Sequence, residues 1–180
     1  MPEIEIRPAI ESDIPHLTKI DHSYRSEYVW QMNPHFESGQ IGAIFREVRM
    51  PRLVQVDYPR STQALAANWQ GRSGNLVALL KGVPVGYASL IRERFPFTAW
   101  MTDLVVDPNH RRQGIGTALV LAALDWVAAR PEDHRLVLEM QPKNHPAICL
   151  AQKLGFDFCG YIDHYYTNRD IAILFTKWII

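Results

Sequence analysis

The amino-acid sequence predicts an α/β fold of the α+β kind: a mixed, mostly antiparallel sheet of six or seven strands with one central parallel pair, flanked by about four helices. Two observations carry this prediction. The apolar runs 76–80 and 83–91 flank the turn dipeptide Lys81-Gly82, which is the pattern of an antiparallel hairpin. A strand, a helix and a second strand then follow one another between residues 98 and 141, and a crossover of that length makes the two strands parallel neighbours.

The N-terminal third of the chain has the weakest pattern. Residues 4–8 alternate and then break at a proline, which predicts a short first strand. Ser12 or Asp13 is expected to cap a following helix. The segment 22–50 mixes aromatic and polar residues without a clear period, and we expect only short helical pieces and loops there. Residues 53–57 predict one more strand, at an edge because prolines flank it.

The remaining elements are defined more sharply. A helix that begins at Ile115 carries an apolar stripe and ends before Pro131, since the residue before a proline avoids the helical region. A shorter helix ends at Gly155, which is expected to cap it in the left-handed conformation. The elements expected in this part of the chain are strands at 76–80, 83–91 and 98–106, the helix from 115, a strand at 136–141, a helix at 146–154, and strands at 156–163 and 170–178.

Length and charge limit the classes of function. The chain has 180 residues, which suits one domain over residues 1–180. Nineteen Lys and Arg residues balance nineteen Asp and Glu residues, so no overall field attracts nucleic acid or an anionic membrane. We therefore expect neither as a partner, and we expect a monomer or a homodimer. A polyanion would have to bind at a local site, which suits a small phosphorylated molecule.

The sequence carries no membrane, metal or disulfide signal. No apolar run approaches the ~20 residues that span a bilayer, and residues 1–5 lack the order of a signal peptide, so we expect a cytoplasmic location. The seven histidines show no metal-ligand spacing, which predicts no metal site. Cys149 and Cys159 are too few for a disulfide framework, and we expect both to be reduced and buried.

The most informative stretch runs from Leu104 to Thr117 and reads LVVDPNHRRQGIGT. A β-rich run ends at Asp-Pro, two arginines follow, and Gly-Ile-Gly opens a helix whose first N–H groups have no partner inside the helix. Such a helix start binds phosphate groups, and glycine lets the backbone approach them closely. The stretch lacks both the third glycine of a dinucleotide fingerprint and the Gly-Lys-Ser/Thr of a Walker A loop.

A second group of residues lies about 25 positions further on. Glu139 interrupts an apolar strand, Asn144 follows, and Pro-Ala-Ile and Leu-Gly-Phe come next. Together with Arg-x-x-Gly-x-Gly, these residues resemble the two co-substrate segments of the GNAT superfamily of acyl-CoA-dependent N-acetyltransferases. The resemblance covers about residues 76–160. The Leu-Glu pattern is similar to that of ribosomal-protein N-terminal acetyltransferases, and residues 155–172 are loosely similar to streptothricin-acetyltransferase-like members.

The resemblance implies a GNAT fold in which the strands ending near Val106 and Gln141 splay apart as a V, with acetyl-CoA in the gap. Pantetheine would pair like an extra strand with the backbone of Leu104, Val105 and Val106. The residues that would surround the pyrophosphate are Arg111, Arg112, Gln113, Gly114, Ile115, Gly116 and Thr117. One of the two arginines would add a charge-assisted contact. Asn144 matches a position that contacts the co-substrate, and the alternative is that it caps the helix beginning near Pro146.

The implied chemistry is direct transfer of acetyl from the thioester to a primary amine, which requires a neutral amine and a protonated leaving thiol. Glu139 matches the general base of relatives and would act directly or through water, with Asp103 in reserve. The alternative is that Glu139 only bonds to backbone or pairs with an arginine. Ala151 stands where many relatives carry the tyrosine that acts as general acid. The tyrosines left as candidate acids are Tyr161, Tyr165 and Tyr166.

The acceptor is the least defined part of the prediction. Glu27 and Asp170, with the rings of Tyr28 and Trp30, could contact a cationic amine through charge and cation–π attraction. The alternative is that these residues are solvated surface. Three functions follow: acetylation of a small amine or antibiotic-like molecule, acetylation of a protein or peptide N-terminus, and, in a different class, acyl-CoA binding with weak catalysis.

Overall fold

The computed structural model describes residues 3–179, except for the side chain of Glu93. Its main sheet has seven strands in the order β1-β4-β5-β6-β7-β9-β8. Every neighbouring pair is antiparallel except β6 and β7. The strands of this sheet are β1 (Ile4–Pro8), β4 (Gly74–Leu80), β5 (Val83–Phe95), β6 (Thr98–Val106), β7 (Arg135–Met140), β8 (Asp157–Ile162) and β9 (Ala172–Trp178). The predicted mixed sheet with one parallel pair is confirmed.

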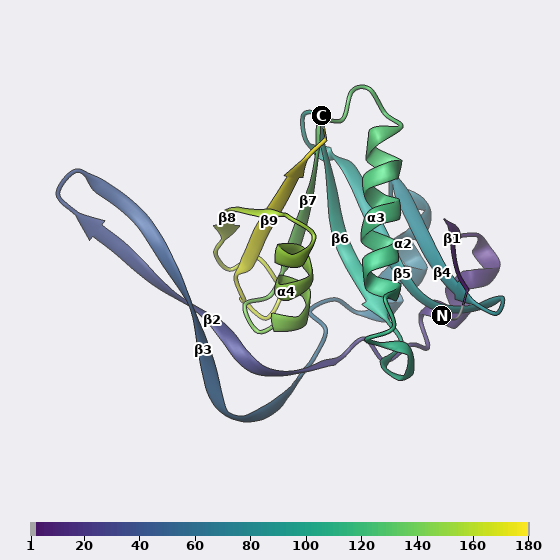
Figure 1. The fold of residues 1–180 in the computed structure, drawn as a ribbon, viewed down its shortest axis with the longest axis horizontal. Coiled ribbons are helices and arrows are strands. Elements are labelled where there is room, and N and C mark those ends of the chain that lie inside the picture. The colour runs from purple at the N-terminus through teal and green to yellow at the C-terminus, as the bar shows by residue number, and fades with distance from the viewer. Residues whose placement is uncertain (1–2, 180) are drawn as a thin grey trace.

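Helices cover both faces of the sheet, because its central strands are apolar on both sides (Figure 1). On one face, Leu76 and Ala78 of β4 belong to the core that the helix α3 (Ile115–Ala128) covers, and α4 (His145–Lys153) packs against β7 and contributes to the same core. The alternate residues Val77 and Leu79 pack on the opposite face with the short helix α1 (Ile14–Leu17) and with Leu65 of α2 (Thr62–Asn68). Three 3₁₀ turns complete the helical elements: 11–13, 69–71 and 108–110.

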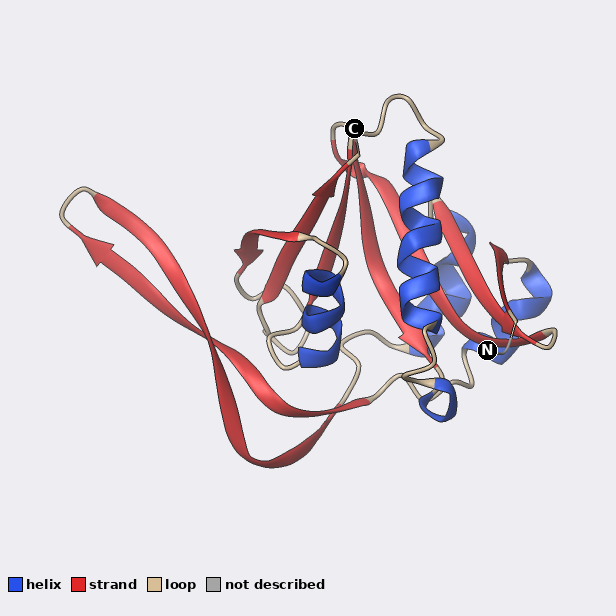
Figure 2. Cartoon of the chain, viewed as in Figure 1, coloured by secondary structure: helices blue, strands red, loops and turns tan. Residues whose placement is uncertain are grey.

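The parallel pair β6–β7 is short, and this opens the centre of the sheet. Pairing runs only from Thr98 opposite Arg135 to Met101 opposite Leu138. Beyond that point β6 stays paired with β5, while β7 stays paired with β9. The two strands therefore diverge toward their carboxyl ends, as Figure 2 shows. The V inferred from the family resemblance is present.

The prediction for residues 22–50 was wrong. They form most of a long antiparallel hairpin, β2 (Tyr24–Glu37) and β3 (Gln40–Val56), which is a separate two-stranded sheet. The expected strand at 53–57 is the end of β3. Two features hid the alternation of apolar and polar residues in the sequence: the register shifts between Ser26 and Tyr28, and prolines interrupt both strands. The dipeptide Ser38-Gly39, with Gly39 at a φ of 76°, makes the turn and was the available signal.

Two local predictions need correction. Asp13 precedes α1, but its carboxylate accepts from both guanidinium nitrogens of Arg7, at 2.7 and 2.9 Å, and from the N–H of Ile10, so it braces β1 and does not cap the helix. Arg7 lowers the pKa of this carboxyl group. Cys149 and Cys159 are both exposed, because each lies on the outer side of an element at the margin of the fold.

Candidate active site

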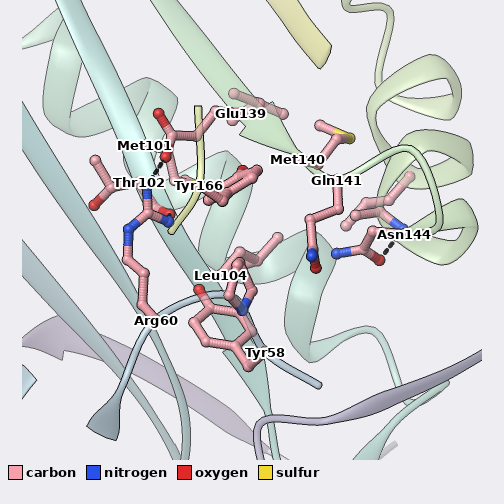
Figure 3. A pocket seen from close by; sticks show the side chains of 14 residues that line it. Tyr58, Arg60, Met101, Thr102, Leu104, Glu139, Met140, Gln141, Asn144 and Tyr166 are labelled. Carbon is pink, nitrogen blue, oxygen red and sulfur yellow. Dashed lines mark hydrogen bonds and ion pairs between the residues drawn. The ribbon is translucent and has the colours of Figure 1, made fainter. Parts of the chain in front are cut away.

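A pocket lies where β6 and β7 diverge, and its volume is about 520 Å³ including the space that opens to solvent. Strand β6 forms one wall, β7 and α4 form the opposite wall, and the loop after β3 forms the rim (Figure 3). The lining residues are Tyr58, Pro59, Arg60, Met101, Thr102, Leu104, Leu138, Glu139, Met140, Gln141, Asn144, Ala147, Leu150 and Tyr166. The pocket joins residues from four separate stretches of the chain.

Glu139 lies in this pocket with its side chain fully covered. Arg60 donates to one carboxylate oxygen. The other oxygen accepts from Arg94 at 3.0 Å, from the hydroxyl of Tyr165 at 2.6 Å and from the indole N–H of Trp100. Glu139 thus pairs with two arginines, and its role as general base stays a prediction. Four donors surround this buried carboxylate, two of them charged.

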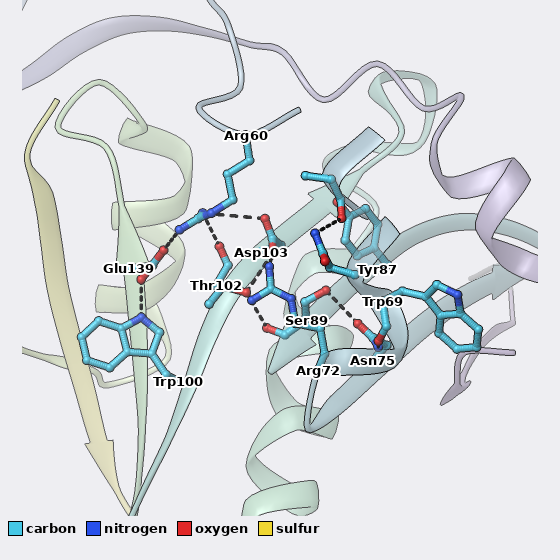
Figure 4. Close-up of polar contacts among 12 residues, drawn as sticks. Arg60, Trp69, Arg72, Asn75, Tyr87, Ser89, Trp100, Thr102, Asp103 and Glu139 are labelled. Atoms are coloured by element: carbon cyan, nitrogen blue, oxygen red, sulfur yellow. Dashed lines mark hydrogen bonds and ion pairs between the residues drawn. The ribbon is translucent and has the colours of Figure 1, made fainter. Parts of the chain in front are cut away.

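Asp103, the reserve candidate for the base, lies on the other side of the same arginine (Figure 4). The carboxylate is buried and accepts from the hydroxyl of Tyr58 at 2.7 Å and from that of Thr102 at 2.8 Å. Arg60 stands 3.7 Å and Arg72 3.8 Å from its oxygens. Two carboxylates on neighbouring strands are therefore bridged by one guanidinium group.

Arg60 is the centre of this arrangement. Burial disfavours its charge, but Glu139 and Asp103 more than offset this effect and raise the pKa of Arg60. The guanidinium also donates to the carbonyl of Thr102 at 2.8 Å and lies over the ring of Tyr166, 5.2 Å from its centroid. The site therefore holds one cation between two acidic groups and an aromatic face, which is the environment that a cationic ligand requires.

Two of the three candidate acids lie near this cluster. Tyr166 lines the pocket, and burial raises the pKa of its hydroxyl well above the ordinary value, so that it stays protonated. Burial and Glu139 raise the pKa of Tyr165 to about 12, and its proton is directed at Glu139. Tyr161 lies on the edge strand β8 and contacts Phe45 of the hairpin. Ala151 is fully buried in α4 and has no polar group to offer.

The loop between β6 and α3 has the open amides that the sequence predicts. Arg112 and Gly114 both have a positive φ, of 64° and 87°. Within the described residues, the backbone N–H groups of residues 112–117 have no acceptor, and the first bond of the helix runs from Ala118 to the carbonyl of Gly114 at 2.9 Å. A Cβ built on Gly114 meets no atom within 4 Å. This helix start is geometrically able to hold a phosphate group.

The two arginines of this loop differ in their surroundings. Arg111 donates to the carbonyls of Val106 at 2.9 Å and Ser23 at 2.8 Å, and burial lowers the pKa of its side chain. It ties the end of β6 to the segment before β2. Arg112 is exposed. Of these two arginines, Arg112 is therefore the one whose guanidinium group is available to bind a phosphate group.

The free side of β6 matches the position expected for a pantetheine chain. Val105 and Leu104 pair with β5 on one side, and beyond Met101 their other side has no strand partner among residues 3–179. Leu104 also lines the pocket, together with Asn144. The side chain of Asn144 accepts from the N–H of Ala147 at 3.3 Å, so the capping alternative is confirmed. Its contact with a co-substrate stays a prediction.

The four residues suggested for acceptor contact do not line the pocket. Glu27 is exposed and lies 3.8 Å from Arg49 across the hairpin, while Trp30 packs against the core. Tyr28 stacks on His145 at 4.6 Å between centroids. Asp170 lies behind the pocket, where it accepts from Gln141 at 2.8 Å.

Sequence reasoning named Tyr165 but missed the other residues that surround Glu139 and Asp103. Arg60 and Tyr58 come from the loop between β3 and α2, and Arg94 comes from the far end of β5. The one available signal was Trp100, a residue with a polar N–H inside a strand otherwise suited to the core, which needs a buried acceptor.

The fold and the site together define an α/β protein whose central sheet opens between two diverging strands, with an open helix start beside the gap. Residues 42–156 match the model of the acetyltransferase (GNAT) family. The chain is 30% identical to streptothricin acetyltransferase of Streptomyces lavendulae, over 87% of this chain and 82% of the relative. It is also 30% identical to [ribosomal protein bS18]-alanine N-acetyltransferase of Escherichia coli K12, over 63% of this chain and 74% of the relative.

A solved structure shares the fold of this chain. A putative streptothricin acetyltransferase from Bacillus anthracis, in complex with acetyl coenzyme A, superposes with a TM-score of 0.75 at 20% identity and covers 98% of this chain and 100% of its own. The chain belongs to the GNAT family of acetyltransferases. It is an N-acetyltransferase of this family.

Across residues 3–179, no helix is long and apolar enough to cross a bilayer. In the same part of the chain, no three His, Cys, Asp or Glu side chains are arranged to hold a metal ion.

The site predicts a pH dependence of stability through His22, which is buried beside Asp103 in a second, smaller hollow. Its Nδ1 meets the carbonyl of Ile20 at 2.6 Å and its Nε2 meets the hydroxyl of Tyr87 at 3.0 Å, and burial lowers the pKa of the ring. The unfolded chain, with a His pKa near 6.5, therefore binds the proton more readily.

We expect the free energy of unfolding to fall as the pH drops below about 6.5. The share of this fall that comes from protonation of His22 should disappear in His22→Asn, whose side-chain amide keeps a donor toward the carbonyl of Ile20. Urea titrations at pH 5.0 and 7.5 measure the difference between the two proteins. A pH dependence as steep in His22→Asn as in the wild type would assign the effect to other groups. The variant His16→Asn, at an exposed position, is the control.

Proposed function

We propose that this N-acetyltransferase transfers acetyl from acetyl-CoA directly to a primary amine of a small cationic molecule, with streptothricin-type antibiotics as the favoured acceptors. The observation that carries the proposal is the pair of buried carboxylates, Glu139 and Asp103, on either side of one cation in the pocket between β6 and β7. The similarity to a streptothricin acetyltransferase over most of both chains supports the choice of acceptor.

The residues that fit acetyl-CoA lie on one continuous path. The open amides of residues 112–117 and the guanidinium group of Arg112 fit the pyrophosphate. The unpaired edge of Leu104 and Val105 fits the amide groups of the pantetheine arm, in the manner of an added strand. Acetyl-CoA supplies an acetyl group activated as a thioester, and the path leads that group toward the pocket that contains Glu139.

The acceptor and Arg60 compete for the same place in this proposal. Arg60, Arg72 and Arg94 surround two carboxylates, so the site as folded already has one cation in excess. An ammonium group can enter only where a guanidinium group leaves. Arg60 is the group whose departure opens both carboxylates, because it contacts both Glu139 and Asp103 and is carried by the loop between β3 and α2.

Glu139 acts as the general base once Arg60 has moved. The departure of Arg60 frees the carboxylate oxygen to which it donates, while Arg94, Trp100 and Tyr165 keep the group in place through the other oxygen. The freed oxygen then takes a proton from the acceptor ammonium, directly or through water. Tyr166, whose raised pKa keeps its hydroxyl protonated, is the candidate donor to the leaving thiol. Asp103 holds the second charge of the acceptor.

Acetylation of a protein N-terminus is the second candidate, because of the similarity to the bS18-alanine N-acetyltransferase. That activity needs an open groove that admits a peptide chain. Here Tyr58 and Arg60 form the rim of the pocket and close it toward Asp103, which favours a small acceptor.

Thiol release from acetyl-CoA with a panel of acceptors tests the function. We expect turnover with streptothricin, weaker turnover with polyamines, and none with alanine-terminated peptides. Glu139→Gln should lower kcat by roughly 10²–10⁴-fold with little change in acetyl-CoA affinity, since a general base contributes that much. Turnover of peptides alone would establish the N-terminal acetyltransferase, and acetyl-CoA binding without turnover of any acceptor would establish a binding protein. Undiminished kcat in Glu139→Gln would remove Glu139 as the base.

The displacement of Arg60 predicts a specific kinetic pattern. Arg60→Gln should lower the KM of a cationic acceptor, because the competing cation is gone. Arg72→Gln, which removes a cation that contacts Asp103 but not Glu139, should change that KM less. Steady-state kinetics at low salt measure both. A fall in kcat with an unchanged KM in Arg60→Gln would show that Arg60 positions Glu139 during turnover.

The position of the pyrophosphate is tested at Gly114. A tryptophan there projects into the open space at the helix start, and we expect Gly114→Trp to weaken acetyl-CoA binding at least tenfold, about 1.4 kcal/mol. Gly82→Trp is the matched control, since Gly82 also has a positive φ and open surroundings but lies in the turn between β4 and β5. Isothermal titration measures both affinities. Equal affinities would place the pyrophosphate elsewhere.

A further inference from the structure

The hairpin β2–β3 extends far beyond the rest of the molecule (Figures 1 and 2). Its base is attached to the body: the N–H of Trp30 donates to the carbonyl of Pro142 at 2.9 Å, and Tyr28 stacks on His145. The end of the hairpin, residues 33–44, projects past β8 into solvent. A two-stranded ribbon is at best marginally stable alone in water, so this outer part requires an explanation.

The two faces of the hairpin differ in chemistry. Because side chains alternate along a strand, the register places the even residues of β2 and the odd residues of β3 on one face. Near the base this face also carries Arg49 and Glu47, but from Trp30 and Phe45 outward to the tip it is apolar, and we call this part the arm stripe. The arm stripe consists of Trp30, Met32, Pro34, Phe36, Ile41, Ala43 and Phe45. The opposite face is mixed, with Asn33, His35 and Glu37 among its members.

The body of the protein covers only the inner half of the arm stripe. Phe45 packs against Phe158 and Tyr161 of β8, with ring centroids 5.6 and 5.4 Å apart, and Trp30 packs against the main core. The outer half is open: Phe36 is 74% exposed and Ile41 is 90% exposed. The same surface that is buried at the base therefore continues uncovered at the tip.

The ribbon also lacks the usual protection against association. Exposed strand edges are commonly guarded by charges, lysine above all. Residues 33–45 contain no Lys, Arg or Asp, and their only Glu is Glu37, which lies 3.8 Å from His35; the whole hairpin 24–56 has no lysine. An unguarded apolar ribbon of this kind is a surface that a partner covers.

The body offers a matching surface directly beside the arm. Strand β8 is the last strand of the main sheet, so one of its edges is unpaired in the described residues. Phe158 on this strand is 51% exposed and Tyr161 is 38% exposed, even though both touch Phe45. The arm stripe and β8 thus form an apolar corner that is open on one side.

We propose that a second copy of this chain occupies the corner. A two-fold axis beside β8 would place the outer arm stripe of each copy against the β8 corner and the arm of the other, so that Phe36 and Ile41 of both copies become buried. One chain carries the projecting ribbon and the open edge side by side, so a symmetric pair satisfies both surfaces at once. No other partner needs to supply a complementary surface.

The test is the mass in solution, measured by light scattering over a range of concentrations that includes tens of micromolar. We expect the wild-type chain to have the mass of two chains, and Phe36→Asp with Ile41→Asp to have the mass of one. Leu121→Glu on α3, which alters an exposed leucine outside the arm, should keep the mass of two chains. A wild-type monomer, or a dimer that survives the double substitution, would overturn the proposal.

A second measurement excludes a simple unfolding of the altered arm. In a chain with Cys149→Ser and Cys159→Ser, the substitution Ile41→Cys introduces one thiol at the most exposed position of the arm stripe. We expect a maleimide to label this thiol slowly at concentrations where the dimer forms and quickly on dilution. A labelling rate that is fast and independent of concentration would show that the stripe is uncovered. Neither result depends on the identity of the acetyl acceptor.

Discussion

The structure depends on the place where β6 and β7 stop pairing. Four residue pairs hold the two strands in parallel, and beyond Met101 and Leu138 each strand keeps only its outer neighbour. A buried, unpaired strand edge would leave N–H and C=O groups without partners, which is costly unless a ligand satisfies them. The gap is therefore where we propose that acetyl-CoA binds. It places the unpaired edge of β6, the open start of α3 and the carboxylate of Glu139 along one path.

Electrostatics then decide what the inner end of the gap can hold. Glu139 and Asp103 are both buried, and burying a carboxylate without partners is costly. The protein supplies Arg60, Arg72 and Arg94, together with hydroxyl groups and the indole N–H of Trp100. The result is a site already filled by a cation of the protein itself. In the proposed mechanism, exchange of that cation for an ammonium group links binding of the acceptor to the release of a base.

The sequence predicted the half of the fold that follows local rules. The β4–β5 hairpin, the crossover through α3 and the cap at Gly155 are each specified by turn residues and periodicity within a short window, and the open amides before α3 follow from the same information. The hairpin β2–β3 was missed because its alternation is interrupted by prolines and a register shift. The partners of Glu139 were missed for another reason. Arg60 is 79 positions away from Glu139, and no periodicity within one element reports a contact of that range.

Amide hydrogen exchange with and without coenzyme A tests the central claim most directly, because it reports on the individual N–H groups at issue. The account predicts that coenzyme A slows exchange at residues 104–106 and 112–117, which face the gap, and leaves β1 and the β4–β5 turn unchanged. Protection confined to other segments, or no protection at all at saturating coenzyme A, would contradict the account and show that the opening between β6 and β7 is not where the co-substrate binds.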